Sequence, residues 1–83
     1  MSKKILYFSA IWCGPCRMMN TIIDELKQDH IPIEKLDVDT NSEKVKKYGV
    51  RSIPTFILLN DDIEGGRLIG GQSKNNLLTF YNN

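Results

Sequence analysis

The feature that most constrains the fold is the junction between an apolar run and a helical pattern near the start of the chain. Residues Lys4 to Ala10 form a compact apolar run, which is typical of a buried strand. Cys13-Gly14-Pro15-Cys16 follows closely, and Pro15 suits the first turn of a helix, where a missing N–H costs nothing. Apolar residues then recur at helical spacing, at Met18, Met19, Ile22, Ile23 and Leu26. The sequence therefore predicts a strand followed directly by a helix, with both cysteines at the junction.

The rest of the chain continues the alternation of strands and helices. The first helix is expected to end near Asp29-His30, and Gly49 is a suitable stop for the second. Asn60-Asp61-Asp62 and Gly65-Gly66 mark the turn region of a hairpin. The remaining elements are strands within 31–39, 55–59 and 67–70, and helices at 42–48 and after a capping Ser73. The order βαβ-α-ββα predicts an α/β fold, a mixed four-stranded sheet flanked by three helices, in a single domain spanning 1–83.

Cysteine use indicates chemistry and a reducing compartment. The chain has two cysteines, three positions apart, and a disulfide between them closes too small a loop to stabilise the fold through chain entropy. A small secreted domain usually carries several disulfides. No apolar run approaches the roughly 20 residues of a membrane span, and the first run lacks the cleavage pattern of a signal peptide. We therefore expect a cytoplasmic protein.

The spacing of the cysteines predicts different roles for them. Cys13 is placed at the helix N-terminus, where free N–H groups and the helix dipole favour a thiolate, so it is the expected nucleophile. Cys16, one turn inward, is the expected resolving thiol, and Gly14 and Pro15 leave the Cys13 sulfur open to a partner. Zinc shared between two chains and a pair of inert core cysteines remain alternatives. His30 is expected near a helix end as a cap rather than as a ligand.

Trp12-Cys13-Gly14-Pro15-Cys16 resembles the active-site motif of the thioredoxin family. The resemblance continues through residues 35–39, 48–55 and 68–70 and covers nearly the whole chain. It implies a thioredoxin fold and a thiol–disulfide oxidoreductase that reduces protein disulfides. It also implies a cis Ile53-Pro54 bond and an apolar surface for oxidised partners formed by Trp12, Gly14, Pro15, Ile53, Pro54 and Gly70.

The sequence departs from the family pattern in three places. It begins directly at the strand before the motif, without the family's preceding strand and helix, so the second strand is expected at a sheet edge. In the family, the strand before the motif carries a buried acid that helps to deprotonate the resolving cysteine. Tyr7 stands in its place here, so Cys16 needs another base, with water or the Cys13 thiolate as candidates. The proline that kinks the family's active-site helix is Thr21, which predicts a straighter helix.

The resemblance implies an electron supply as well. We expect an NADPH-dependent flavin reductase as the electron donor, ribonucleotide reductase as one disulfide substrate, and no bound cofactor or metal. A net charge of +1 argues against nucleic-acid binding, and a monomer is expected. The length and Ile69-Gly70-Gly71 are similar to glutaredoxins, so a glutathione-dependent activity is one alternative, with Arg17, Arg51 and Gly70-Gly71 as candidate glutathione contacts. A non-enzymatic binding subunit is the other.

Overall fold

A computed structural model describes residues 2–83. Strands and helices follow the predicted order, although their ends differ from the expected ones by a few residues. The elements are β1 (Lys3–Ser9), α1 (Gly14–Gln28), β2 (Ile33–Asp37), α2 (Ser42–Tyr48), β3 (Thr55–Asn60), β4 (Ile63–Ile69) and α3 (Lys74–Asn82).

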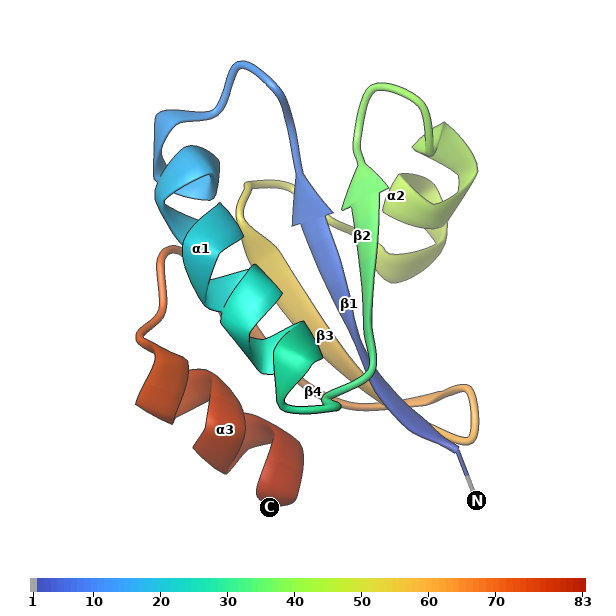
Figure 1. Ribbon diagram of the computed structural model, residues 1–83. Helices are drawn as coiled ribbons and strands as arrows, with labels where there is room; N and C mark the ends of the chain where they lie inside the picture. The colour runs from blue at the N-terminus through green and yellow to red at the C-terminus, as the bar shows by residue number, and fades with distance from the viewer. Residues whose placement is uncertain (1) are drawn as a thin grey trace.

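The four strands form one mixed sheet in the order β2-β1-β3-β4 (Figure 1). β1 pairs in parallel with β2, whereas the β1–β3 and β3–β4 pairs are antiparallel. β1 is central and every side chain from Ile5 to Ser9 is buried, as its unbroken apolar run predicted. The mixed four-stranded sheet with three helices is therefore confirmed, and β2 lies at a sheet edge as expected.

Helices cover both faces of the sheet (Figure 1). On one face α1 and α3 enclose a core that includes Tyr7, Ile23, Phe56 and Leu77. On the other face α2 covers a smaller core of β1, β2 and β3 side chains, which Val45 and other half-buried residues complete. Alternate residues of β1 supply the two cores, because successive side chains of a strand point to opposite faces.

Helix ends agree with the local signals in the sequence. The Ser73 side chain accepts a hydrogen bond from the Asn76 N–H at 3.0 Å and so caps α3. Gly49 ends α2 in the left-handed conformation, with φ of 61°. α1 is one uninterrupted helix through Thr21. The proline that the family carries at this position would remove a backbone hydrogen-bond donor.

The predicted extent of the hairpin turn was wrong. Asp61 and Asp62 alone form the turn, with φ values of 51° and 70°, and β4 begins at Ile63. Gly65-Gly66 lies inside β4, opposite a register shift between Leu58 and Leu59. Aspartate tolerates the left-handed region better than most residues, so this turn needs no glycine.

Candidate active site

The two cysteines lie where β1 leads into α1. Cys13 is the N-cap of α1, with an extended backbone, and Cys16 lies in the first turn of the helix. The two residues form a disulfide, with their Cα atoms 5.2 Å apart. Gly14 and Pro15 occupy the first two helical positions between them and are exposed. The predicted junction of strand, cysteine pair and helix is confirmed.

The helix start supplies a hydrogen-bond donor to the Cys13 sulfur. The backbone N–H of Cys16 donates to Cys13 Sγ at 3.2 Å. The first N–H groups of a helix have no partner within it, and the helix dipole places partial positive charge at this end. Helix N-termini are positions at which cysteine thiolates are stabilised in proteins.

The Cys13 side chain is less accessible than the sequence suggested. We expected its sulfur to be open to a partner, but Cys13 is only 5% exposed in the disulfide form. Val38 and Ile53 pack against the cysteine pair and cover it from the β2 and β3 sides. Approach to the sulfur therefore requires contact with this apolar rim.

Trp12 is held over the rim by a hydrogen bond that was not predicted from the sequence. Its side chain is 65% exposed, and its indole N–H donates to Asp39 Oδ2 at 2.9 Å. The Asp39 backbone N–H in turn donates to Asp37 Oδ1 at 2.8 Å. A signal was available, because β1 and β2 are parallel and the residues that follow them meet at one edge of the sheet.

The segment before β3 completes the same end of the sheet. The Ile53-Pro54 peptide bond is cis, as the resemblance implied. The Gly70 N–H donates to the Pro54 carbonyl oxygen at 2.8 Å, which ties the end of β4 to this segment. Gly70 has a φ of 92°, which favours glycine. Ile53, Pro54 and Gly70 thus lie at the same end of the molecule as Trp12 and the cysteines.

Tyr7 lies in the core beneath the cysteine pair. Its side chain is fully buried, its ring stacks on Phe56 with centroids 5.0 Å apart, and its hydroxyl donates to the Cys16 carbonyl oxygen at 3.0 Å. Burial raises the pKa of Tyr7, so it is a neutral phenol at physiological pH. Tyr7 therefore supports the start of α1 as a hydrogen-bond donor.

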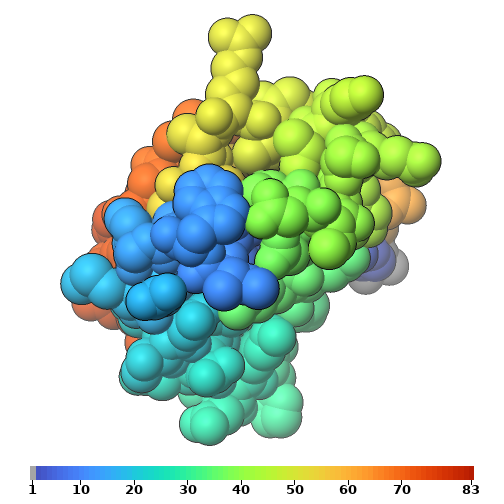
Figure 2. Space-filling view, turned by 90° about the horizontal axis from the view of Figure 1, so that it is seen from above, coloured from blue at the N-terminus to red at the C-terminus, as the bar shows by residue number. Residues whose placement is uncertain are grey.

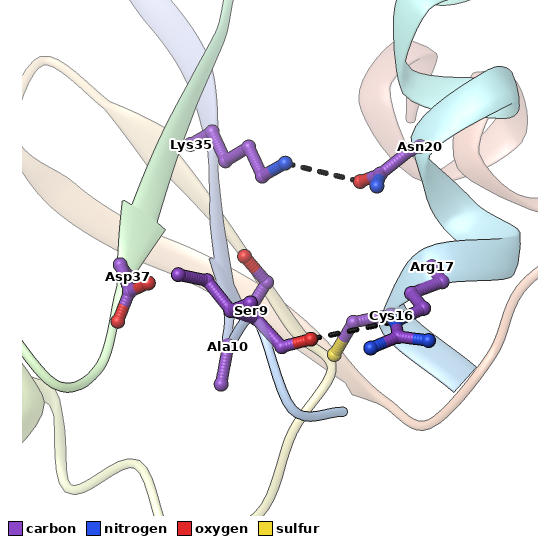
Figure 3. A pocket seen from close by; sticks show the side chains of 8 residues that line it. Ser9, Ala10, Cys16, Arg17, Asn20, Lys35 and Asp37 are labelled. Carbon is purple, nitrogen blue, oxygen red and sulfur yellow. Dashed lines mark hydrogen bonds between the residues drawn. The ribbon is translucent and has the colours of Figure 1, made fainter. Parts of the chain in front are cut away.

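Two cavities flank the cysteine pair. One, of about 410 Å³, lies between β1, β2 and α1, and its lining includes Ser9, Cys16, Arg17, Asn20, Lys35 and Asp37 (Figure 3). The other, of about 380 Å³, is mainly apolar and is lined by Trp12, Val38, Val45, Val50, Arg51, Ser52 and Ile53. In the view from above, the segment before α1 (blue) lies between α1 and the green to yellow segment around α2 (Figure 2).

Other candidates from the sequence lie apart from one another. His30 follows the C-terminal end of α1, away from the cysteines. Arg17 and Arg51 line different cavities, one on each side of the cysteine pair. Among residues 2–83, no group of three His, Cys, Asp or Glu side chains is placed to hold a metal ion. In the same range, no helix is both long and apolar enough to cross a membrane.

Comparison with known proteins identifies the family. The thioredoxin family model matches residues 1–83. Thioredoxin of Rickettsia prowazekii is 42% identical over 78 residues, which cover 90% of this chain and 74% of that protein.

Solved structures agree. A mutant thioredoxin from Halobacterium salinarum matches with a TM-score of 0.88 and 32% identity, covering 95% of this chain and 71% of that one. A chain from a structure on thiol resolution in yeast mitochondrial 1-Cys peroxiredoxin via glutathione/thioredoxin systems matches with a TM-score of 0.88 and 31% identity, covering 98% and 77%. With its disulfide at a helix N-terminus, the chain belongs to the thioredoxin family and is a thiol–disulfide oxidoreductase, a protein disulfide reductase that carries the Cys13–Cys16 pair.

Proposed function

We propose that Cys13 is the attacking thiolate and Cys16 the resolving thiol in the reduction of protein disulfides. The observation that carries this assignment is the position of Cys13 as the N-cap of α1, with the Cys16 N–H donating to its sulfur. A donor and the positive end of the helix dipole both lower the free energy of a thiolate at that sulfur. Cys16 is only 2% exposed, which suits a thiol that attacks the neighbouring Cys13 sulfur rather than the partner's disulfide.

The reaction transfers two electrons in two exchanges. The Cys13 thiolate attacks one sulfur of the partner's disulfide, and the other partner sulfur leaves as a thiolate, which takes a proton from water. Cys16 then loses its proton and attacks the Cys13 sulfur. The Cys13–Cys16 disulfide forms, the bond from Cys13 to the partner breaks, and the second partner sulfur leaves with the electron pair. The partner ends as a dithiol and this chain as the disulfide.

We propose that partners dock on Trp12, Gly14, Pro15, Ile53 and Gly70. Pro54, the sixth residue expected in this surface, is less than 2% exposed and lies beneath it. These residues surround the cysteine pair, and the adjacent apolar cavity extends the surface toward Val45 and Val50. Trp12→Ala is expected to raise KM for a protein disulfide several-fold and to change kcat little. Ile63, which is 72% exposed at the start of β4, provides the matched control, since Ile63→Ala removes an exposed apolar side chain at the hairpin turn.

The partners are proposed on the family relationship. An NADPH-dependent flavin reductase restores the dithiol, and ribonucleotide reductase is one substrate. The similarity to a chain from the peroxiredoxin structure adds peroxiredoxins as a second substrate class. We also propose that the chain acts as a single-domain monomer. Its cysteines serve chemistry rather than structural cross-linking, which favours the reducing cytosol.

The electron source is tested by supplying two reducing systems separately. Insulin disulfides are offered with NADPH and a thioredoxin reductase, or with glutathione, glutathione reductase and NADPH. We expect rapid turnover only in the first system, and rapid turnover in the second would establish the glutathione-dependent alternative. The Cys13→Ser, Cys16→Ser double variant tests the binding-subunit alternative, because a function that survives it needs no thiol chemistry.

The roles of the cysteines are tested by trapping. Cys16→Ser is expected to accumulate a mixed disulfide between Cys13 and the partner, detected as an added mass that dithiothreitol removes. Cys13→Ser is the matched control and should accumulate none. Trapping by Cys13→Ser and not by Cys16→Ser would reverse the assignment.

A further inference from the structure

Cys16 must lose a proton before it attacks. This requirement rests on the proposed function, in which Cys16 closes the disulfide, and on the general rule that the thiolate is the nucleophile. The Cys16 side chain is only 2% exposed, so its proton needs a path out of the protein and a group that receives it.

Tyr7, the buried side chain that is hydrogen-bonded to Cys16, does not accept that proton. The Tyr7 hydroxyl already donates to the Cys16 carbonyl oxygen at 3.0 Å. Burial raises the pKa of Tyr7, which keeps the phenol protonated. Tyr7 is therefore a donor at physiological pH and offers no base.

The cavity between β1, β2 and α1 provides a path. Its volume is about 410 Å³, many times the roughly 30 Å³ that one water occupies in the liquid. Cys16 forms part of the lining, together with polar groups of Ser9 and Asn20 that can hold water. The lining also includes exposed Arg17 and Lys35, so the cavity reaches the surface of the protein.

Among the residues that the structure describes, Asp37 supplies the only carboxylate in this lining. It is the last residue of β2, opposite Ser9 in the parallel register, and it is half-buried. Its Oδ1 accepts the Asp39 N–H at 2.8 Å, which fixes the side chain at the cavity wall. The other charged side chains in the lining are two cations, Lys35 on β2 and Arg17 on α1. Asp39, in the turn after β2, is the one further anion beside Asp37 that the hydrogen bonds place there.

We propose that Asp37 accepts the proton of Cys16 through water in the cavity that both residues line. A carboxylate is a far stronger base than water, so it accepts a thiol proton through a water bridge more readily than water alone does. Lys35, whose ammonium donates to Asn20 Oδ1 at 3.1 Å across the cavity, places a positive charge in the same lining.

The step balances as a proton transfer coupled to disulfide exchange. The Cys16 S–H bond breaks, a cavity water takes this proton, and that water passes one of its own to the Asp37 carboxylate. The Cys16 thiolate forms the bond to Cys13 Sγ, and the partner sulfur leaves with the electron pair of the broken mixed disulfide. Asp37 then returns the proton to solvent through the open side of the cavity.

The test isolates the Cys16 step with 5,5′-dithiobis(2-nitrobenzoate) and the reduced protein in a stopped-flow instrument. The first burst of coloured thiolate reports attack by Cys13 and depends on reagent concentration. The second reports closure by Cys16 and does not. The released aromatic thiolate stays unprotonated near neutral pH, so the pH dependence of the second phase belongs to the protein. Cys16→Ser, which should remove only the second phase, checks the proposed function separately.

Asp37→Asn removes the negative charge and keeps an oxygen that can accept the Asp39 N–H, so the turn holding Trp12 is retained. We expect the second phase to slow at least about tenfold at pH 6. The deficit should shrink as pH rises to 9, because hydroxide replaces the lost base. The first phase should be unchanged and serves as an internal control for folding. Asp24→Asn, on an exposed position of α1, is the matched control and should leave both phases unchanged.

The sign of the effect separates proton acceptance from simple electrostatics. A carboxylate that only repels the Cys16 thiolate raises the free energy of that thiolate, so removing the charge would accelerate closure. A second phase in Asp37→Asn that is unchanged, faster, or slowed equally at pH 6 and pH 9 would overturn the proposal. Loss of the second phase in Cys16→Ser with no effect of Asp37→Asn would leave the cysteine roles standing and this inference refuted.

Discussion

Replacing Tyr7 with phenylalanine separates its structural contribution from any part in the chemistry. Tyr7→Phe keeps the ring that stacks on Phe56 and removes one hydroxyl from a fully buried position. The hydroxyl donates to the Cys16 carbonyl at 3.0 Å. That carbonyl lies in α1, where the helical hydrogen-bond pattern offers it a second donor. The substitution therefore removes one hydrogen bond without leaving a buried acceptor unpaired.

A net loss of about 1 kcal/mol in the free energy of unfolding follows for one such bond. In a chain of 83 residues this corresponds to a melting temperature lower by roughly 4–8 °C. Urea denaturation of the oxidised protein, followed by circular dichroism, measures the change at constant m-value.

Tyr81→Phe is a matched control, because its hydroxyl makes a longer bond of 3.4 Å to the Lys3 carbonyl at a half-buried position. We expect a smaller loss there, below about 0.5 kcal/mol. The account of Tyr7 also predicts that Tyr7→Phe leaves the pH profile of Cys16 closure unchanged. Unaltered stability would refute the structural role, and a tenfold slower closure at neutral pH would show that the phenol takes part in proton transfer.

Three further predictions concern stability. Leu77→Ala should lower the free energy of unfolding by about 2–5 kcal/mol, since Leu77 is fully buried in the core that α1 and α3 enclose; a loss below about 1 kcal/mol would contradict the two-helix layer. Ser73→Ala should cost about 1 kcal/mol by removing the α3 cap, whereas Ser73→Asp should not. Hydrogen bonds from Lys4 and Lys44 hold the pKa of Glu34 below its ordinary value. Its contribution is therefore present above the ordinary glutamate pKa and is lost as pH falls through the lowered one, so the pH titration of stability should be flatter at acid pH in Glu34→Gln, and an unchanged titration would count against the pairing.

Much of the fold was readable because local signals agreed with the tertiary arrangement. The apolar run in β1 is buried on both faces, and Ser73 and Gly49 begin and end helices as their chemistry predicts. The hairpin was harder. Gly65-Gly66 is a strong turn signal, but the register of β3 against β4 places it inside a strand, and pairing of that kind is not encoded locally.

The site was predictable only where its residues are adjacent in sequence or shared with the family. The cysteine pair at a helix start followed from spacing, whereas the cis Ile53-Pro54 bond came from the resemblance alone. The contact of Trp12 with Asp39 and the cavity beside Cys16 depend on how β1 meets β2. A small polar residue at Ser9, within an otherwise apolar run, was the one sequence sign of that space.

The reduction potential of the Cys13–Cys16 pair tests the central claim most directly. The pair is equilibrated with defined glutathione and dithiothreitol buffers, and the oxidised fraction is measured by mass spectrometry after alkylation. A protein disulfide reductase should have a potential more negative than the cytosolic glutathione pool, below about −260 mV. A potential above about −200 mV would contradict the account, because the dithiol would then be too weak a reductant for stable protein disulfides and the pair would act as an oxidant.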